Sequence, residues 1–182
     1  MDQEISQYTK SGQQTEAAED ILKIAGTFEK KGVFLILEIL EWLHKNIKER
    51  ELAPAEKKEI FRKRAARDII ESGFATGCTD FAIVFVVLAR AKGIPAKYVE
   101  VIEREWLEKG GDIIQGHAFS EVYLDGNWLI VDPQGALIKA WYGKRYVIYG
   151  EGLDSADLGI NNFDDLKNKF SEFRENWLQN KN

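Results

Sequence analysis

The chain contains a single cysteine, Cys78, within a GCTD sequence at residues 77–80. This stretch joins a glycine-bearing loop to an apolar segment over residues 81–89, which we expect to be helical. A thiol at the N-terminus of a helix meets the positive end of the helix dipole and free N–H groups, and both favour the thiolate. Asp80 then fits the first turn as a capping or dipole-compatible residue. Cys78 is therefore a candidate nucleophile, and its ordinary alternative role is that of a small buried apolar residue.

A predicted β-hairpin brings a histidine and an aspartate together. Residues 118–124 and 128–131 have the period-two pattern of strands, and the DG pair at residues 125–126 is typical of a two-residue turn. With such a turn, the numbers of every opposed residue pair add to 251. His117 and Asp132 then share one face as diagonal neighbours, about 7–8 Å apart at the backbone. An imidazole and a carboxylate can meet across that distance, whereas a three-residue turn would separate their faces.

A carboxylate beside an imidazole fixes its tautomer and stabilises the imidazolium form, which is what a nucleophile–base–carboxylate triad requires. Each residue also has an ordinary structural role: His117 as a hydrogen-bonded histidine, and Asp132 as the residue that ends a strand before Pro133. The hairpin does not place Cys78 against His117. A metal site made from all three residues would lack the tight local spacing of zinc ligands, so we expect no metal and no cofactor.

The elements that must position these residues follow from the spacing of apolar residues. A polar stretch at residues 1–14 predicts a mobile tail, so that a single domain covers residues 15–182. Helical spacing changes to period two after Pro95, and the expected fold class is α+β, with N-terminal helices packed on an antiparallel sheet. The expected helices cover about 15–28, 33–50, 54–70, a fully buried segment from 79 to before 93, and 163–178; the expected strands cover 98–102, 118–124, 128–131 and 146–149.

The composition is that of one globular domain. The chain has 182 residues, of which 45% are hydrophobic and 30% are charged, so wholesale disorder is excluded. A net charge of −5 without a basic cluster argues against nucleic acid as a partner, and one cysteine excludes an internal disulfide. The first residues lack the pattern of a signal peptide, and no apolar run approaches ~20 residues. We therefore expect no membrane span and a cytoplasmic location; the sequence does not indicate an oligomeric state.

Four blocks of sequence, taken in order, resemble the core of the transglutaminase-like superfamily, across about residues 66–135. Each block alone is unspecific, but the four in this order are highly specific. They are Gly77–Ala82, Leu88–Ala96, His117–Tyr123, and Trp128 with Val131–Pro133.

The resemblance implies a papain-like fold core with a Cys-His-Asp triad, in which the cysteine begins a helix and the other two residues lie on neighbouring strands. By position, it implies that Cys78 is the nucleophile, His117 the base and acid, and Asp132 the orienting group. Phe119 departs from the family, whose members often carry tryptophan there, and it lacks the indole N–H. The chain is also far shorter than the calcium-dependent animal cross-linking enzymes, which argues against protein cross-linking.

These implications predict a cysteine-dependent acyl-transfer enzyme that acts on peptide or amide bonds through a thioester, as a protease or amidase rather than a cross-linking transamidase. The expected partner is a peptide or protein substrate, with a primary amine as an alternative acyl acceptor to water. The competing interpretation is a non-catalytic binding module that retains the fold.

An oxyanion hole would use the backbone N–H of Cys78 as its first donor. Gln115 and Trp42 are the candidates for a second donor, and their alternative roles are those of a polar loop residue and a core aromatic. The other histidine, His44, is expected on a helix surface.

Overall fold

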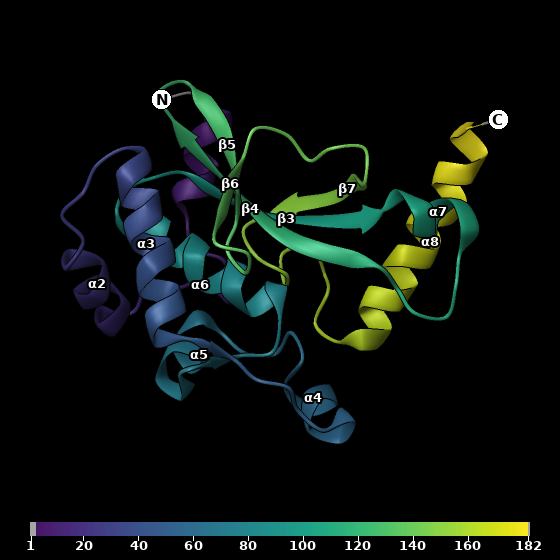
Figure 1. The fold of residues 1–182 in the computed structure, drawn as a ribbon, viewed down its shortest axis with the longest axis horizontal. Helices are drawn as coiled ribbons and strands as arrows, with labels where there is room; N and C mark the ends of the chain where they lie inside the picture. Colours follow the sequence, from purple (N-terminus) through teal and green to yellow (C-terminus); the bar gives the residue numbers. More distant parts are fainter. Residues whose placement is uncertain (1–2, 182) are drawn as a thin grey trace.

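Helices dominate the first half of the chain and strands the second half in the computed structural model, which describes residues 3–181 (Figure 1). The helical elements are α1 Gln3–Ser6, a 3-10 turn at Gln7–Thr9, α2 Glu19–Gly26, α3 Val33–Asn46, α4 Pro54–Ile60, α5 Ala66–Ser72, α6 Cys78–Ala91, α7 Arg104–Lys109 and α8 Phe163–Lys181. The strands are β1 Lys48–Glu49, β2 Phe74–Ala75, β3 Ala96–Glu103, β4 Gly116–Leu124, β5 Asn127–Asp132, β6 Leu137–Lys139 and β7 Tyr146–Gly152.

The main sheet has five strands in the order β6-β5-β4-β3-β7, and every neighbouring pair is antiparallel. A separate parallel pair, β1 with β2, lies next to α5. In Figure 1, the N-terminal helices lie on one side of the molecule and α8 lies at the opposite end. The α+β class with an antiparallel sheet is therefore confirmed.

Helix α6 forms the centre of the core. Residues 79–90 are buried without interruption, and α6 packs against β4, α2, α3 and α5. A helix covered on every side needs no polar face, which explains why its sequence is apolar throughout. The predicted buried helix is confirmed.

The β4–β5 hairpin has the predicted register. Leu124 opposes Asn127, and the ladder continues to the pair Ser120 and Val131. Asp125 and Gly126 both have positive φ, at 49° and 87°, as a two-residue turn of a twisted hairpin requires.

The N-terminal segment differs from the expected tail. Residues 3–9 form helical turns, and the backbone N–H of Gln14, whose side chain is buried, donates to the Asp154 carboxylate at 2.7 Å. Arg90 also donates to the Tyr8 carbonyl oxygen at 3.0 Å. These long-range contacts hold residues 3–14 on the domain, and polar composition alone did not reveal them. Met1 and Asp2 lie outside the described residues.

The helix predicted over residues 54–70 is wrong: the chain forms two helices, α4 and α5, separated by residues 61–65. Arg62 has a φ of 59° in this break, a conformation that ends a helix. Its buried side chain forms an ion pair with Glu100 of β3, so a contact distant in sequence explains the break. The first two helices are also shorter than predicted, because α2 begins at Glu19 and α3 ends at Asn46.

Helix α8 closes the fold at the end of the sheet. The Asn162 side chain accepts hydrogen bonds from the N–H groups of Asp164 and Asp165, both at 2.9 Å, and so caps the helix as predicted. Phe170 is fully buried and reaches the β4 backbone, where a Cβ on Gly116 would lie 2.7 Å from its ring. Only glycine therefore fits at residue 116. The short elements α7 and β6 were not predicted.

No helix within residues 3–181 has both the length and the hydropathy that a membrane crossing needs.

Candidate active site

Cys78 is the first residue of α6, as the sequence predicts. The residue before it, Gly77, has a φ of 151° and a ψ of −166°, a conformation that side chains disfavour. The glycine thus lets the chain turn sharply into the helix. The Cys78 side chain is half-buried, and within the described residues no side chain caps the start of α6. The first N–H groups of this helix therefore point towards the space around the sulfur.

Asp80 does not cap its own helix. Its buried carboxylate accepts hydrogen bonds from the N–H of Thr76 at 2.7 Å and from the Thr76 hydroxyl at 2.8 Å, and it forms an ion pair with Arg64. Asp80 therefore stabilises the turn that precedes Cys78, whereas the sequence suggested that it would cap the helix or interact with the helix dipole.

His117 and Asp132 are hydrogen-bonded, with 2.9 Å between His117 Nε2 and Asp132 Oδ1. His117 lies near the start of β4 and Asp132 is the last residue of β5, so the hairpin register brings them together. Both side chains are mostly buried, at 18% and 11% exposure. A second donor, the N–H of Gly135, binds the same carboxylate oxygen at 3.2 Å. The His–Asp pair predicted from hairpin geometry is present.

The environment favours a protonated His117. Burial by itself would lower the pKa of the ring, but the hydrogen bonds to Asp132 and Cys78, and the charges of both groups, outweigh it and raise the pKa to about 9. Burial opposes ionisation of Asp132, and the bonds from His117 and Gly135 together with nearby Lys139 lower its pKa. The pair therefore favours imidazolium beside carboxylate at neutral pH.

Cys78 lies beside His117, because both residues line one cleft and the interaction with Cys78 contributes to the raised pKa of the histidine. Asp132 occupies Nε2, so Nδ1 is the ring nitrogen that remains for the sulfur. The structure therefore brings together all three predicted site residues.

Aromatic rings and a lysine hold the His–Asp pair. Phe119 meets the His117 ring edge-on at 4.5 Å between centroids, and Tyr146 lies roughly parallel to it at 6.3 Å. Lys139 Nζ lies 3.5 Å from the second Asp132 oxygen. Tyr146 and Lys139 come from β7 and β6, and local sequence gave no sign of either contact.

The sequence suggested a surface position for His44, but its side chain is half-buried and connects three elements. Its Nε2 lies 2.8 Å from the carbonyl oxygen of Pro133, the residue after Asp132, and its ring stacks on Phe81 of α6 at 5.3 Å. A carbonyl can only accept, so His44 Nε2 carries the proton. This contact ties the end of β5 to α3 and to the helix that begins with Cys78.

The two candidates for a second oxyanion donor lie elsewhere. Gln115 is exposed and lines a separate surface depression beside Trp106. Trp42 packs edge-on against Phe28, and the Phe28 carbonyl accepts from Lys92, beyond the far end of α6. Neither Gln115 nor Trp42 lines the cleft that contains Cys78, so neither is supported as the second donor.

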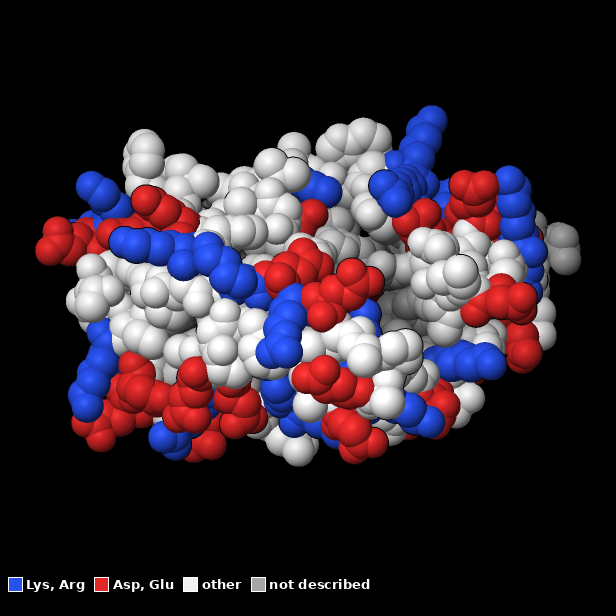
Figure 2. All heavy atoms as spheres, turned by 60° about the horizontal axis from the view of Figure 1, so that its bottom comes forward, with Lys and Arg blue, Asp and Glu red and all other residues white. Residues whose placement is uncertain are grey.

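A cleft of about 490 Å³ opens beside Cys78 and His117. Its walls come from α4, from the loop before β4 and from the first half of α8. Figure 2 shows the face on which α4 lies: it is hollowed right of centre, and acidic and basic side chains are interspersed over it.

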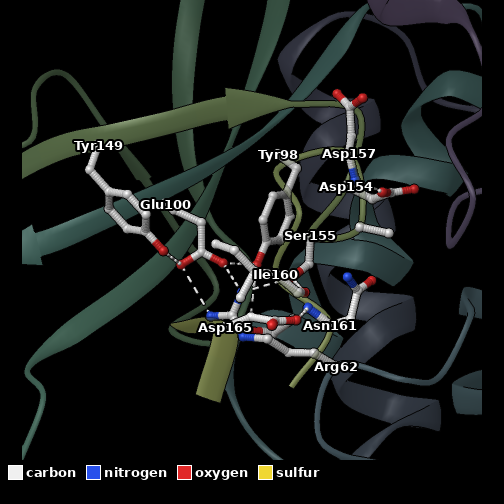
Figure 3. A network of polar contacts seen from close by, with 12 residues as sticks. Arg62, Tyr98, Glu100, Tyr149, Asp154, Ser155, Asp157, Ile160, Asn161 and Asp165 are labelled. Atoms are coloured by element: carbon white, nitrogen blue, oxygen red, sulfur yellow. Dashed lines mark hydrogen bonds and ion pairs between the residues drawn. The ribbon is translucent and has the colours of Figure 1, made fainter. Parts of the chain in front are cut away.

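A buried polar network lies under the cleft. The carboxylate of Glu100 pairs with Arg62 and accepts hydrogen bonds from the hydroxyls of Tyr98 and Tyr149, which approach it from two sides (Figure 3). Arg62 also donates to the Ser155 hydroxyl at 2.8 Å. The network joins the α4–α5 break, β3, β7 and the segment before α8. It therefore fixes the walls of the cleft relative to the sheet.

Among residues 3–181, no group of three histidine, cysteine or acidic side chains is arranged to hold a metal ion. Of the three site residues, His117 and Asp132 are hydrogen-bonded to each other, and Cys78 and His117 line the same cleft.

Comparison with known protein families gives one result over most of the chain. The family model described as "Transglutaminase-like superfamily" matches residues 7–133 of the chain. The matched region contains Cys78, His117 and Asp132, but it ends before β6, β7 and α8. A search of curated proteins found no match.

Two solved structures have the same fold at low sequence identity. A Cytophaga hutchinsonii protein described as "a putative cysteine protease" has a TM-score of 0.67 and 23% identity over 88% of this chain. A Parabacteroides distasonis protein described as "a putative protease" has a TM-score of 0.52 and 13% identity over 82% of this chain. The alignments cover 50% and 29% of those longer chains.

Proposed function

Since the chain belongs to the transglutaminase-like superfamily, we propose that it is a cysteine hydrolase that cleaves peptide or amide bonds through a thioester on Cys78. The observation that carries this proposal is the arrangement of His117, which is bonded to Asp132 through Nε2 and lines the same cleft as Cys78. The two structural neighbours described as proteases support the same reaction class.

In the first half of the reaction, Cys78 Sγ attacks the substrate carbonyl carbon. The thiol proton is already on the His117 ring, which favours imidazolium at neutral pH, and a tetrahedral oxyanion forms as the sulfur attacks. When the carbon–nitrogen bond breaks, His117 returns this proton to the leaving amine and a thioester remains. Asp132 holds the ring in one orientation and stabilises its positive charge throughout.

In the second half, water attacks the thioester carbonyl while His117 accepts a proton from the water. The carbon–sulfur bond then breaks, the carboxylic acid leaves, and the proton taken from water stays on His117 for the next cycle. The balance is one water consumed for each amide bond cleaved.

The oxyanion requires donors close to the sulfur. The backbone N–H of Cys78 begins α6, where no side chain of the described residues competes for it, and the helix dipole adds to its effect.

Hydrolysis is favoured over amine transfer because the cleft opens to solvent and Cys78 is only partly buried. Water at bulk concentration reaches such a thioester unless a closed tunnel excludes it.

The test combines labelling with turnover. Because Cys78 is the one cysteine in the chain, iodoacetamide uptake reports on that sulfur alone. We expect one label per chain at neutral pH, cleavage of members of a peptide library, and loss of both in Cys78→Ala. Addition of a primary amine, with products read by mass spectrometry, separates a cleaved backbone from an amine-substituted product.

Cleavage that persists in Cys78→Ala would refute the proposal. A reactive thiol without turnover on any peptide would favour the binding-module interpretation.

A further inference from the structure

The cleft beside Cys78 has apolar walls supplied from three parts of the chain. Phe61 follows α4 and stacks face to face on Phe163, the first residue of α8, with 3.7 Å between ring centroids and 5° between planes. Leu166 continues this wall one turn along α8, and Ile113 and Ile114 face it from the loop before β4. The two walls therefore enclose a flat, apolar space next to the nucleophile.

The wall formed by α8 is held firmly against the rest of the fold. Phe170 of α8 lies against Gly116, the residue before His117, with no room for a Cβ between them. Arg174 donates to the Leu107 carbonyl oxygen at 2.9 Å, which holds α8 against α7. Helix α8 lies outside residues 7–133, so the family match does not extend to this wall.

The charges around the cleft do not favour a charged occupant. The rim carries Lys57 and Lys167, but also Asp112 and Asp164, so the two signs balance. At the floor, the Glu100 carboxylate is already paired with a guanidinium and hydrogen-bonded to two tyrosine hydroxyls. A charged side chain that reached this floor would lose its water without gaining a free partner there.

We propose that this cleft is a specificity subsite that binds an aromatic or branched apolar side chain of the peptide substrate, next to the carbonyl that Cys78 attacks. The inference rests on the proposed function and adds the substrate class. Its volume of about 490 Å³ accommodates such a side chain with adjoining backbone, in the range of small-molecule pockets. Phe163 is 37% exposed and Ile113 is 76% exposed, so an occupant would cover apolar surface that water now contacts.

The test compares two reagents that alkylate the sulfur with displacement of iodide: N-benzyl iodoacetamide and N-(carboxymethyl) iodoacetamide. The ratio of the two alkylation rates is also measured with free cysteine in solution, and this ratio corrects for the different intrinsic reactivities of the two reagents. We expect Cys78 to favour the benzyl reagent by about tenfold relative to free cysteine, which corresponds to about 1.4 kcal/mol.

Two variants probe the walls and one serves as a matched control. Phe163→Ala should lower the benzyl preference several-fold, and Ile113→Ala, at an exposed loop position that cannot unfold the domain, should lower it about twofold. Phe34→Ala removes another exposed ring, on α3 and outside the cleft lining, and should leave the ratio unchanged.

The outcomes separate this inference from the proposed function. Alkylation by plain iodoacetamide without a benzyl preference, or a preference that survives Phe163→Ala and Ile113→Ala, would overturn the subsite and leave the nucleophile intact. Failure of every reagent to label Cys78 would overturn the proposed function, and the subsite with it.

Discussion

Replacing Asp132 by asparagine should lower the pKa of His117 from about 9 towards its ordinary value of 6.5. The change removes the negative charge that lies 2.9 Å from Nε2, while the size of the side chain stays almost the same and its amide oxygen can still accept a hydrogen bond. Cys78 still favours the imidazolium in this variant, so we expect the new pKa between the two values rather than at 6.5.

The size of the effect follows from the raised pKa. A pKa of about 9 instead of 6.5 corresponds to a preference for imidazolium on the order of 3 kcal/mol. A general acid that loses its orienting carboxylate typically loses about 10²–10⁴-fold in rate. We therefore expect kcat/KM of Asp132→Asn to fall by about that factor, and the alkaline limb of its pH profile to move below pH 9.

The same pKa makes a prediction for stability. Because folding raises the pKa of His117, the protonation of this ring stabilises the folded state. That contribution to the free energy of unfolding is complete below about pH 6.5 and is lost as the pH rises through about 9. Urea denaturation of the wild type should show this loss between pH 6.5 and 9.5, and Asp132→Asn should show a smaller one.

The assay has an internal check. The chain has two histidines, so ring-proton NMR of the wild type and of a His44→Gln variant assigns the His117 titration directly. Asp125→Asn, at the tip of the same hairpin, is the matched control and should leave the titration unchanged. A His117 pKa that stays near 9 in Asp132→Asn would refute the assignment of Asp132 as the main cause.

Three further predictions concern the surroundings of the site. Arg62→Met should destabilise the fold by about 3–5 kcal/mol in urea denaturation, because it leaves Glu100 buried without its partner cation; a smaller effect than about 1 kcal/mol would contradict a buried ion pair. Gly116→Ala should lower the free energy of unfolding by about 1–3 kcal/mol and should lower kcat, because its Cβ would lie 2.7 Å from the Phe170 ring. Gly26→Ala, which has open space around residue 26, should change neither. His44→Ala leaves the Pro133 carbonyl oxygen without its hydrogen bond, so it should lower the free energy of unfolding by about 1–3 kcal/mol and kcat/KM several-fold. An unchanged kcat/KM would argue against a positioning role for His44.

Arg62 illustrates what local sequence could not reveal. Pro54 and the apolar spacing after it favour one continuous helix to Ile70, yet the chain breaks at Arg62 so that its guanidinium reaches Glu100. Helical propensity is worth fractions of a kcal/mol per residue, and a buried charge without a partner costs several kcal/mol, so the tertiary contact prevails. His44 was misjudged for the same reason, because its carbonyl acceptor lies on a distant strand end.

The sequence by itself determined the His117–Asp132 pair and the position of Cys78 at the start of a buried helix. Both follow from short-range rules: a two-residue turn fixes hairpin register, and a glycine before an apolar helix fixes where the chain turns. Only the tertiary structure decided that the sulfur faces the free nitrogen of the imidazole, and that α8 provides a wall of the cleft. Those placements depend on packing between segments far apart in the chain, where no periodicity of the sequence specifies which surfaces meet.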